Sequence, residues 1–339
     1  MKVLLYSEGL KQIGKSGLGK AIRHQKRALE LEGVEYTTNP HEDFDVLHIN
    51  TYFLKSICFA QRCRREGKAI VYHAHSTQED FRNSFLFSNQ IAPSVKKWLI
   101  HCYRKGDILI TPTEYSKKLL ERYNMGREIV AISNGIDLSR FAPIEHAREK
   151  FCEKFGYDVR DRIVMGIGLY IERKGILDFV ELARRMPDIQ FIWFGYTNLN
   201  LVPLEIRRAV ETRLPNLRFA GYVENEYINL ALQGTDLYLF PTLEETEGIP
   251  AIEACAAQAN FIVRDIPVFD GWLEHGINTY KAKDVDEFER LTRDHLSGRI
   301  PSLTEAAYAV AQERDLATIG RRLRETYERA LVLRDQRVR

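Results

Sequence analysis

The chain has 339 residues, of which 45% are hydrophobic and 28% charged, and this length suits two domains rather than one. No apolar run approaches the roughly 20 residues of a membrane-spanning helix, and the charged start MKVLLYSE is not a secretory signal. The net charge of +2 is unevenly divided, because residues 1–140 hold 22 Lys and Arg against 15 Asp and Glu. A basic front half indicates an anionic partner, either nucleic acid or anionic lipid.

Short apolar runs alternate with helical stretches along the whole chain. In the first half, strands are expected over 2–6, 45–50, 69–75, 107–111 and 128–133, with helices over 20–32, 94–105 and 115–123. After a turn-rich connector, strands are expected over 162–170, 189–195, 217–223, 236–242 and 260–265, with helices over 175–185, 249–258 and 303–314. This alternation predicts parallel sheets with helices on both faces.

Two such series predict an α/β protein with two Rossmann-like domains, residues 1–140 and residues 141–314. Ligands of open α/β sheets bind at the carboxyl ends of the strands, so the two sheets are expected to face each other across a substrate cleft. The tail from about 315 to 339 reads as a charged helix that is able to pack back on the first domain.

The five cysteines show neither CxxC pairing nor zinc-ligand spacing. Their odd number and their spacing are typical of reduced thiols in a cytosolic protein. We therefore expect neither a disulfide framework nor a structural zinc ion.

The segment Gly9–Ser16, GLKQIGKS, matches the P-loop pattern of nucleotide triphosphatases. A P-loop enzyme also needs a strand that ends in Asp to hold magnesium, yet the next two strands end in Asn50 and His75. The helix is moreover expected to begin after Gly17 and Gly19. We interpret the segment as a Gly-rich loop whose backbone N–H groups approach a phosphate.

The stretch LFPTLEETEGIPAIEACA, 239–256, places Glu245 and Glu253 eight positions apart. A helix is expected to begin near Ile249–Pro250, because proline suits the first turn of a helix. Glu253 then lies one turn into the helix, with Glu245 on the loop before it. Ionised carboxylates accept hydrogen bonds from sugar hydroxyls, and the helix N-terminus offers N–H groups to an anion.

This stretch is one of six ordered motifs, the others being SGLGKAI (16–22), YHAHST (72–77), SNGID (133–137), ERKG (172–175) and FAGYV (219–223). Together they resemble family 4 of the retaining glycosyltransferases, which have the GT-B fold. The resemblance implies transfer of a hexose from a UDP-sugar without a metal ion or other cofactor. The absence of an Asp-x-Asp at a strand end agrees with this expectation.

The resemblance also implies roles for individual residues. Arg173 and Lys174 are expected to hold the diphosphate and stabilise its charge as it leaves, while Glu245 contacts the donor hexose. His75 is expected to reach the hexose from the opposite domain. His73, two residues earlier, is expected to support His75 rather than to contact the hexose. The donor-binding set is Gly17, Glu247, Gly248, Ile249, Pro250 and Glu253, of which Glu253 binds the ribose.

One position departs from the family pattern. The family commonly has Gly-Arg where this chain has Gly168-Leu169, so one phosphate-binding cation is missing from its usual place. Arg173 or Arg264 is expected to replace it. The alternative for Arg264 is a surface or interdomain salt bridge.

Within the family, the chain most resembles the bacterial diglycosyldiacylglycerol synthases, which add galactose or glucose to monoglucosyl-diacylglycerol. Expected partners are therefore a UDP-hexose, a glycolipid and the anionic inner face of the cell membrane. The membrane or acceptor candidates are Phe85, Phe87, Lys96, Lys97, Trp98, Arg104 and Lys105, drawn from an aromatic loop over 80–93 and a basic helix over 94–105.

Three alternatives stay open from the sequence. The apolar face of helix 94–105 suits a protein core as well as a membrane. The acceptor is alternatively a soluble or cell-wall glycan, and the chain is alternatively an inactive sugar-nucleotide-binding scaffold. Nucleic acid is not expected, because no recognition motif accompanies the charge.

Overall fold

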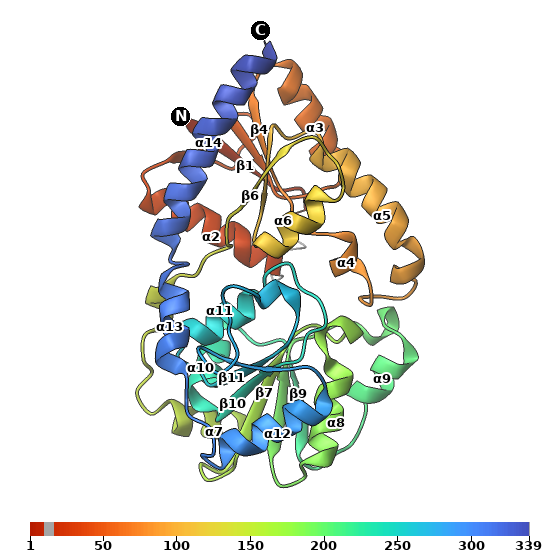
Figure 1. Ribbon diagram of the computed structural model, residues 1–339, viewed down its shortest axis with the longest axis vertical. Coiled ribbons are helices and arrows are strands. Elements are labelled where there is room, and N and C mark those ends of the chain that lie inside the picture. Colours follow the sequence, from red (N-terminus) through yellow and green to blue (C-terminus); the bar gives the residue numbers. More distant parts are fainter. Residues whose placement is uncertain (10–16, 339) are drawn as a thin grey trace. The chain divides into compact units, whose positions relative to one another are not determined.

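The computed structural model describes residues 1–9 and 17–338, which form two compact units (Figure 1). The first unit comprises residues 1–81, 90–137 and those from 314 onward, and the second comprises residues 82–89 and 138–313. The expected domains were 1–140 and 141–314, so the segment 82–89 differs in its assignment. This segment leaves the first unit after residue 81 and returns to it at residue 90.

The first unit contains a six-stranded parallel sheet in the order β2-β1-β3-β4-β5-β6. Its strands are β1 (Lys2–Tyr6), β2 (Glu35–Thr37), β3 (Val46–Ile49), β4 (Ala69–His73), β5 (Ile108–Thr111) and β6 (Glu128–Ala131). Its helices are α2 (Gly17–Leu31), α3 (Leu54–Arg65), α4 (Gln78–Phe81), α5 (Ser88–Tyr103), α6 (Glu114–Glu121) and α14 (Leu316–Val338).

Alternating side chains of this sheet belong to two separate cores. Val3 and Leu5 of β1 pack with residues of α2 and α14, whereas Leu4 between them packs with residues of α3 and α5. This is the period of two that a strand imposes when both faces of its sheet are covered. It places His48 of β3 and His73 of β4 on the face covered by α2 and α14.

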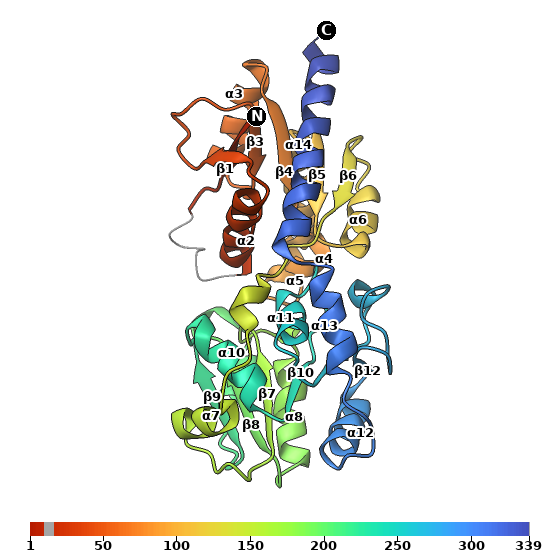
Figure 2. The same cartoon turned by 90° about the vertical axis from the view of Figure 1, so that its left-hand side faces the viewer.

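Helix α14 packs along α2 and over β4 (Figure 2). The helices approach closely, because a Cβ atom added at Gly320 would lie 2.3 Å from the carbonyl oxygen of Ala28. Gly320 is therefore required by the crossing of the two helices. The last 23-residue helix of the chain is in this way part of the first unit.

The second unit contains another six-stranded parallel sheet, in the order β12-β11-β10-β7-β8-β9. Its strands are β7 (Ile163–Ile167), β8 (Gln190–Phe194), β9 (Leu217–Gly221), β10 (Leu237–Phe240), β11 (Phe261–Arg264) and β12 (Tyr280–Ala282). Its α-helices are α7 (Ala147–Phe155), α8 (Ile176–Arg185), α9 (Leu204–Val210), α10 (Asn225–Gly234), α11 (Ile249–Ala256), α12 (Val285–Leu296) and α13 (Thr304–Gln312), and its 3-10 turns are η1 (Leu138–Phe141), η2 (Glu172–Lys174), η3 (Leu199–Leu201) and η4 (Pro267–Phe269).

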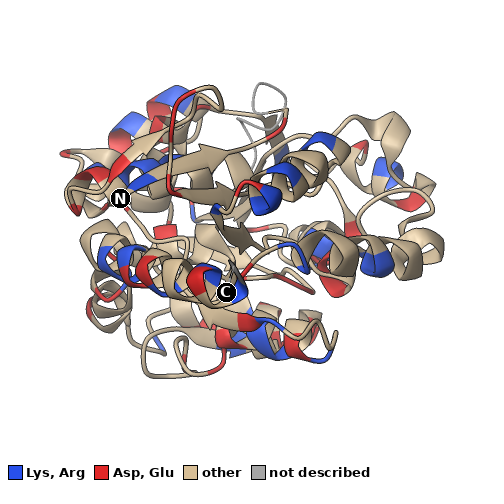
Figure 3. Ribbon diagram, turned by 90° about the horizontal axis from the view of Figure 1, so that it is seen from above, with Lys and Arg blue, Asp and Glu red and all other residues tan. Residues whose placement is uncertain are grey.

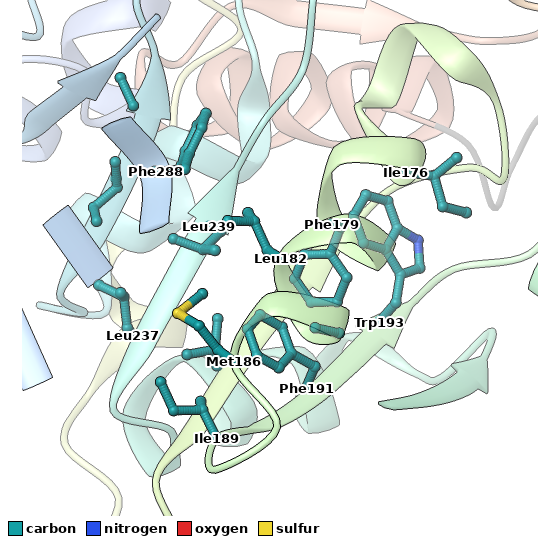
Figure 4. Close-up of a cluster of buried hydrophobic side chains, with 14 of the residues drawn as sticks. Ile176, Phe179, Leu182, Met186, Ile189, Phe191, Trp193, Leu237, Leu239 and Phe288 are labelled. Carbon is teal, nitrogen blue, oxygen red and sulfur yellow. The ribbon is translucent and has the colours of Figure 1, made fainter. Parts of the chain in front are cut away.

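Aromatic packing between α8 and β8 forms the centre of the core of the second unit (Figure 4). Phe179 meets Trp193 and Phe191 edge-to-face, with ring centroids 4.9 and 5.3 Å apart. Such geometry adds a favourable quadrupole interaction to the burial of the rings. The core thus fixes α8, whose first turn follows the Arg173-Lys174 pair.

All ten expected strands are present, and the prediction of two Rossmann-like domains with parallel sheets is confirmed. Two edge strands of three residues each, β2 and β12, were not expected. The prediction of a loop over 80–93 is confirmed for residues 82–87, which lie in no helix or strand. It was wrong for 88–93, because α5 begins at Ser88 and contains Pro93. The prediction that the helix after the Gly-rich loop begins beyond Gly19 was also wrong, since α2 begins at Gly17.

Within residues 1–9 and 17–338, no helix is long and apolar enough to cross a bilayer. All five cysteines are unpaired thiols, and only Cys58 is exposed. Positions of Lys and Arg alternate with positions of Asp and Glu along several of the helices (Figure 3). In the first unit, however, α3 and α5 carry lysine or arginine without any acidic residue.

Candidate active site

A pair of basic residues precedes α8 in the second unit. Arg173 and Lys174 form the turn η2 after strand β7, and Gly175 joins this turn to α8 in a left-handed conformation with φ of 74°. A Cβ atom at Gly175 would lie only 2.1 Å from the carbonyl oxygen of Pro241. The turn therefore packs directly against the chain that leaves β10 and leads to Glu245.

Glu245 binds this basic pair. One of its carboxylate oxygens, Oε1, contacts Nζ of Lys174, and the other lies 3.7 Å from Nη1 of Arg173. The hydroxyl of Thr242 lies 3.0 Å from Oε1 of Glu245 and 3.1 Å from the carbonyl oxygen of Arg173. The structure thus brings together three residues that the sequence singled out and adds Thr242, which the sequence did not indicate.

The electrostatics of Glu245 follow from this arrangement. The side chain is buried, and burial alone raises the pKa of a carboxyl group. The charges of Lys174 and Arg173 outweigh burial, so that the pKa of Glu245 lies below its usual value. Glu245 is thus an anion at neutral pH that holds two cations beside the N-terminus of α8.

Arg173 also bonds to backbone and to the segment 82–89. Its Nη1 donates to the carbonyl oxygen of Glu244 at 2.9 Å, and its Nε donates to Oγ of Ser84 at 3.2 Å. Its backbone N–H donates to the carbonyl oxygen of Asn83 at 3.0 Å. These bonds hold the guanidinium within the second unit.

Helix α11 begins at Ile249, as predicted, after Gly248 in a left-handed conformation with φ of 88° and with Pro250 in the first turn. Glu247 and Glu253 are both buried. Burial, together with the nearby charges of Glu253 and Glu245, raises the pKa of Tyr238. The two glutamates of the Glu-x7-Glu pattern therefore lie near the same phenol, that of Tyr238 in β10.

Arg264 does not replace the missing cation at Leu169. It is buried, and its Nη2 pairs with a carboxylate oxygen of Asp178 in α8. Its Nε and Nη1 donate to the carbonyl oxygens of Pro241 and Lys283 at 3.1 and 2.8 Å. Arg264 thus ties β11 to α8 and to the residues that follow β10 and β12. That Arg173 replaces the missing cation stays a prediction.

In the first unit, His75 follows the carboxyl end of β4 and stacks on His73, with ring centroids 3.9 Å apart and planes 7° apart. Its Nε2 lies 2.8 Å from Oδ1 of Asn50. His73 in turn stacks on His48 at 5.3 Å. The motif YHAHST thus predicted two histidines at one place, and the structure adds His48 and Asn50 from the neighbouring strand.

Burial lowers the pKa of His48 and His75 to about 3 and that of His73 well below its usual value. The unfolded chain takes up protons on these side chains below about pH 6.5, whereas the folded chain does not. The free energy of unfolding is therefore expected to fall as the pH drops from about 6.5, by up to about 1.4 kcal/mol per pH unit for each histidine. Urea unfolding at about pH 7.5, 6.5 and 5.5 measures this slope.

The matched comparison uses His48→Asn and His41→Gln. His41 is exposed, so its replacement is expected to leave the slope unchanged, whereas the loss of His48 is expected to reduce it. Equal slopes in the wild type and His48→Asn would show that His48 does not exclude protons in the folded state.

Gly17 is the first residue of α2, is exposed and has room for a Cβ atom. Lys15 and Ser16 of the P-loop match lie outside the described residues. Because α2 begins at Gly17, the expected late helix start no longer argues against a P-loop. The other argument against a P-loop stands, because neither β3 nor β4 leads to an Asp. Strand β3 is followed by Asn50, and β4 ends in His73.

The membrane candidates are divided between the units. Phe85 and Phe87, exposed by 40% and 71%, lie in the second unit. Trp98, exposed by 36%, lies in the first unit on α5 with its Nε1 donating to the carbonyl oxygen of Tyr52 at 2.8 Å. The other candidates on or just after α5 are Lys96, Lys97, Arg104 and Lys105.

The apolar face of α5 mostly packs inside the protein. Leu99 and Cys102 are fully buried in the core of the first unit, with Val95 at its edge. The sequence left open whether this face packs in a protein core or on a membrane. For these residues, packing in the core is correct. Of the apolar residues Val95, Trp98, Leu99 and Cys102 on this face, only Trp98 is exposed.

Across the described residues, no three His, Cys, Asp or Glu side chains are grouped as ligands for a metal ion. The charged groups gathered at the site are two cations, Arg173 and Lys174, with the carboxylate of Glu245 between them and the N-terminus of α8 beside them. Cations beside a helix N-terminus suit the binding of phosphate groups.

Two solved structures show the same fold over almost the whole chain. The sucrose-phosphate synthase of Thermosynechococcus elongatus superposes with a TM-score of 0.79 at 15% identity, covering 98% of this chain and 99% of the other. Anabaena HepE in complex with UDP and glucose superposes with a TM-score of 0.74 at 17% identity, covering 97% and 99%. These similarities define a GT-B fold.

Sequence comparison defines the family. The model of glycosyltransferase family 4 matches residues 23–140, and that of glycosyl transferases group 1 matches residues 147–313. The chain is 39% identical over 335 residues to the processive diacylglycerol alpha-glucosyltransferase of Acholeplasma laidlawii, covering 98% of this chain and 100% of the relative. It is 24% identical to the alpha-galactosylglucosyldiacylglycerol synthase of Streptococcus pneumoniae, covering 81% and 75%. The chain therefore belongs to glycosyltransferase family 4 and is a glycosyltransferase.

Proposed function

We propose that the protein transfers a hexose from a UDP-hexose to a diacylglycerol-based glycolipid, with monoglucosyl-diacylglycerol as the first acceptor to test. The observation that carries this proposal is the similarity over the full length to a diacylglycerol glucosyltransferase. The cluster of Arg173, Lys174 and Glu245 supports it, because a leaving diphosphate needs cations. The named relatives favour glucose or galactose as the hexose.

In this proposal, the second unit binds the donor. Lys174 and Arg173 bind the diphosphate, and the N-terminus of α11 and the backbone around Glu247–Ile249 bind the hexose. Glu245 keeps the two cations in place and contacts the hexose, while Glu253 accepts hydrogen bonds from the ribose. Gly17 leaves space for backbone N–H groups near a phosphate, and His75 contacts a sugar hydroxyl.

The reaction retains the configuration of the donor sugar. The bond between the sugar carbon and the diphosphate oxygen breaks, and the acceptor oxygen bonds to that carbon on the same face. The proton of the acceptor hydroxyl passes to the leaving diphosphate, so no enzyme nucleophile is required. The charge that grows on the diphosphate is stabilised by Lys174 and Arg173.

The deciding experiment incubates the purified chain with UDP-glucose or UDP-galactose and vesicles that contain monoglucosyl-diacylglycerol. A diglycosyl lipid identified by mass spectrometry is expected, and its anomeric configuration by NMR tests retention. Parallel reactions with EDTA are expected to proceed at an unchanged rate. No lipid product with either donor would remove the lipid assignment, and turnover on soluble glycans without vesicles would favour the alternative acceptor.

We further propose that the protein works as a peripheral protein at the cytoplasmic face of the cell membrane. The exposed aromatic side chains Phe85 and Phe87, and Trp98 with its neighbouring lysines, suit an anionic lipid surface. Leu86, exposed by 45%, extends the aromatic segment and donates its backbone N–H to Leu201.

Reversal of two charges on α5 is expected to weaken binding to anionic vesicles. Each cation near such a surface contributes about 1 kcal/mol, so Lys96→Glu/Lys97→Glu is expected to lower the partition coefficient by at least about 30-fold at low salt. Vesicle sedimentation with phosphatidylglycerol measures this. The matched control is Lys117→Glu/Lys118→Glu on α6, and an equal loss in both variants would show an effect of net charge rather than of this surface.

A further inference from the structure

The buried histidines of the first unit are joined to the C-terminal helix by hydrogen bonds. The hydroxyl of Tyr327 in α14 lies 2.7 Å from Nδ1 of His48. Nε2 of His48 lies 3.2 Å from Nδ1 of His73. Tyr327 and His48 are fully buried and His73 is 3% exposed, so water does not compete for these bonds.

Two amide side chains carry the network on to His75. The amide nitrogen of Gln25 in α2 lies 3.0 Å from Nδ1 of His73 and 2.8 Å from Oδ1 of Asn50. The amide nitrogen of Asn50 donates back to the side-chain oxygen Oε1 of Gln25 at 2.9 Å. Nε2 of His75 lies 2.8 Å from the same Oδ1 of Asn50. Asn50 is thus held by α2 on one side and touches His75 on the other.

With the amides of Gln25 and Asn50 oriented in this way, the network has one direction. An amide NH₂ only donates, so Nδ1 of His73 accepts and its proton is on Nε2. His48 then also donates from Nε2 to Nδ1 of His73, so that Gln25 and His48 share its one lone pair. At its own Nδ1, His48 accepts the Tyr327 hydroxyl proton. Oδ1 of Asn50 only accepts, so His75 donates from Nε2.

The protonation of the second ring nitrogen of His75, Nδ1, follows from this direction. With its proton on Nε2, the ring carries a lone pair on Nδ1, which makes no hydrogen bond to the described part of the chain. Stacking on His73 fixes the plane of the ring, and Asn50 fixes its rotation. His75 is partly exposed, so Nδ1 is available to a ligand, and a lone pair there accepts a hydrogen bond from a hydroxyl group.

We propose that Tyr327, His48, His73 and Gln25 act through Asn50 as positioning residues, which hold His75 with Nδ1 as the acceptor for a sugar hydroxyl. The inference rests on the proposed function for the identity of the ligand, while the network itself does not depend on it. It gives α14 a part in the site of the first unit that no motif in the helix indicates. If Nδ1 of His75 carried a proton, it would donate to the oxygen of the sugar hydroxyl instead of accepting its hydrogen. The network therefore decides whether His75 accepts or donates this hydrogen bond.

The tautomers are tested by ¹⁵N NMR of the histidine rings in the full chain at about pH 7.5. The proposal expects neutral rings with the proton on Nε2 for His48, His73 and His75, assigned by single substitutions. Rotation of the side-chain amides of Gln25 and Asn50 by about 180° would exchange donors and acceptors throughout the network. The protons of the three histidines would then lie on Nδ1. Observation of the Nδ1–H form for His73 or His75 would overturn the proposal, whatever the activity of the enzyme.

Positioning is tested with Tyr327→Phe, which removes one hydroxyl at the far end of the network. The variant is expected to shift the ring nitrogen signals of His75 and to lower kcat about 3- to 10-fold, with little change in KM for the UDP-hexose. The matched control is Tyr123→Phe, another buried tyrosine of the first unit, whose hydroxyl donates to Glu79 outside the network. The control is expected to change neither property.

The double variant Tyr327→Phe/His75→Ala separates positioning from stability. If Tyr327 acts through His75, its replacement lowers kcat no further once His75 is absent. Equal reductions in both backgrounds, or an unshifted His75 signal in Tyr327→Phe, would refute the positioning role. If the wild type transfers no hexose to any acceptor, the proposed function fails, and the tautomers and the His75 shift still decide whether the network exists.

Discussion

Replacement of Lys174 by alanine is expected to lower kcat for hexose transfer by about 10²- to 10³-fold, with a smaller change in KM for the UDP-hexose. Lys174 lies beside the N-terminus of α8 and is bound to Glu245, so its charge is held in place before a donor binds. A preorganised cation stabilises the charge that grows on the diphosphate as its bond to the sugar breaks. Initial rates of UDP release at varied donor concentration measure both constants.

The same substitution is expected to destabilise the second unit, because it removes one partner of a buried ion pair. Such a loss costs about 3–5 kcal/mol in general, and Arg173, 3.7 Å from Glu245, is expected to reduce it. The double variant Lys174→Met/Glu245→Gln removes both charges and is expected to regain most of the stability in urea without regaining activity. Wild-type kcat in either variant would contradict the role of Lys174 at the diphosphate.

Replacement of Gly175 by alanine is expected to lower the free energy of unfolding by about 3–5 kcal/mol and to abolish most of the transfer activity. Two costs add at this position. Alanine is strained at φ of 74°, and its Cβ atom would lie 2.1 Å from the carbonyl oxygen of Pro241. Any movement that relieves this overlap displaces the Arg173-Lys174 turn from Glu245.

Gly156 provides a matched control for this prediction. It has φ of 72° in the same unit, and nothing lies within 4 Å of a Cβ atom placed there. Gly156→Ala is therefore expected to show only the conformational cost of about 1–2 kcal/mol and to keep full activity. If urea unfolding gives equal losses for the two variants, the contact with Pro241 does not constrain the turn.

The elements that could be predicted are those with a strong local pattern. Apolar runs bounded by polar turns predicted both central sheets, and Pro250 predicted the start of α11. The Glu-x7-Glu spacing and the motif ERKG singled out Glu245, Arg173 and Lys174, which the structure brings into contact. These predictions succeeded because the residues that carry each pattern are neighbours in the chain.

The errors have equally physical causes. Strands β2 and β12 have three residues each, which is too short for a period of two to be visible in the sequence. The loop predicted around Phe85 was extended too far, because residues 88–93 belong to α5. Proline usually marks the edge of a helix, so Pro93 inside α5 favoured a late helix start.

The sequence by itself determined the two α/β series and singled out the basic residues of η2 and the acidic residue Glu245, because these depend on patterns along the chain. Only the tertiary structure decided that Arg264 forms an ion pair with Asp178. It also decided that the hydroxyl of Thr242 links Glu245 to the backbone of Arg173. It alone joined Tyr327 to His48, residues 279 positions apart. A hydrogen bond across such a separation forms only when helix packing brings the two groups together, and no local pattern records it.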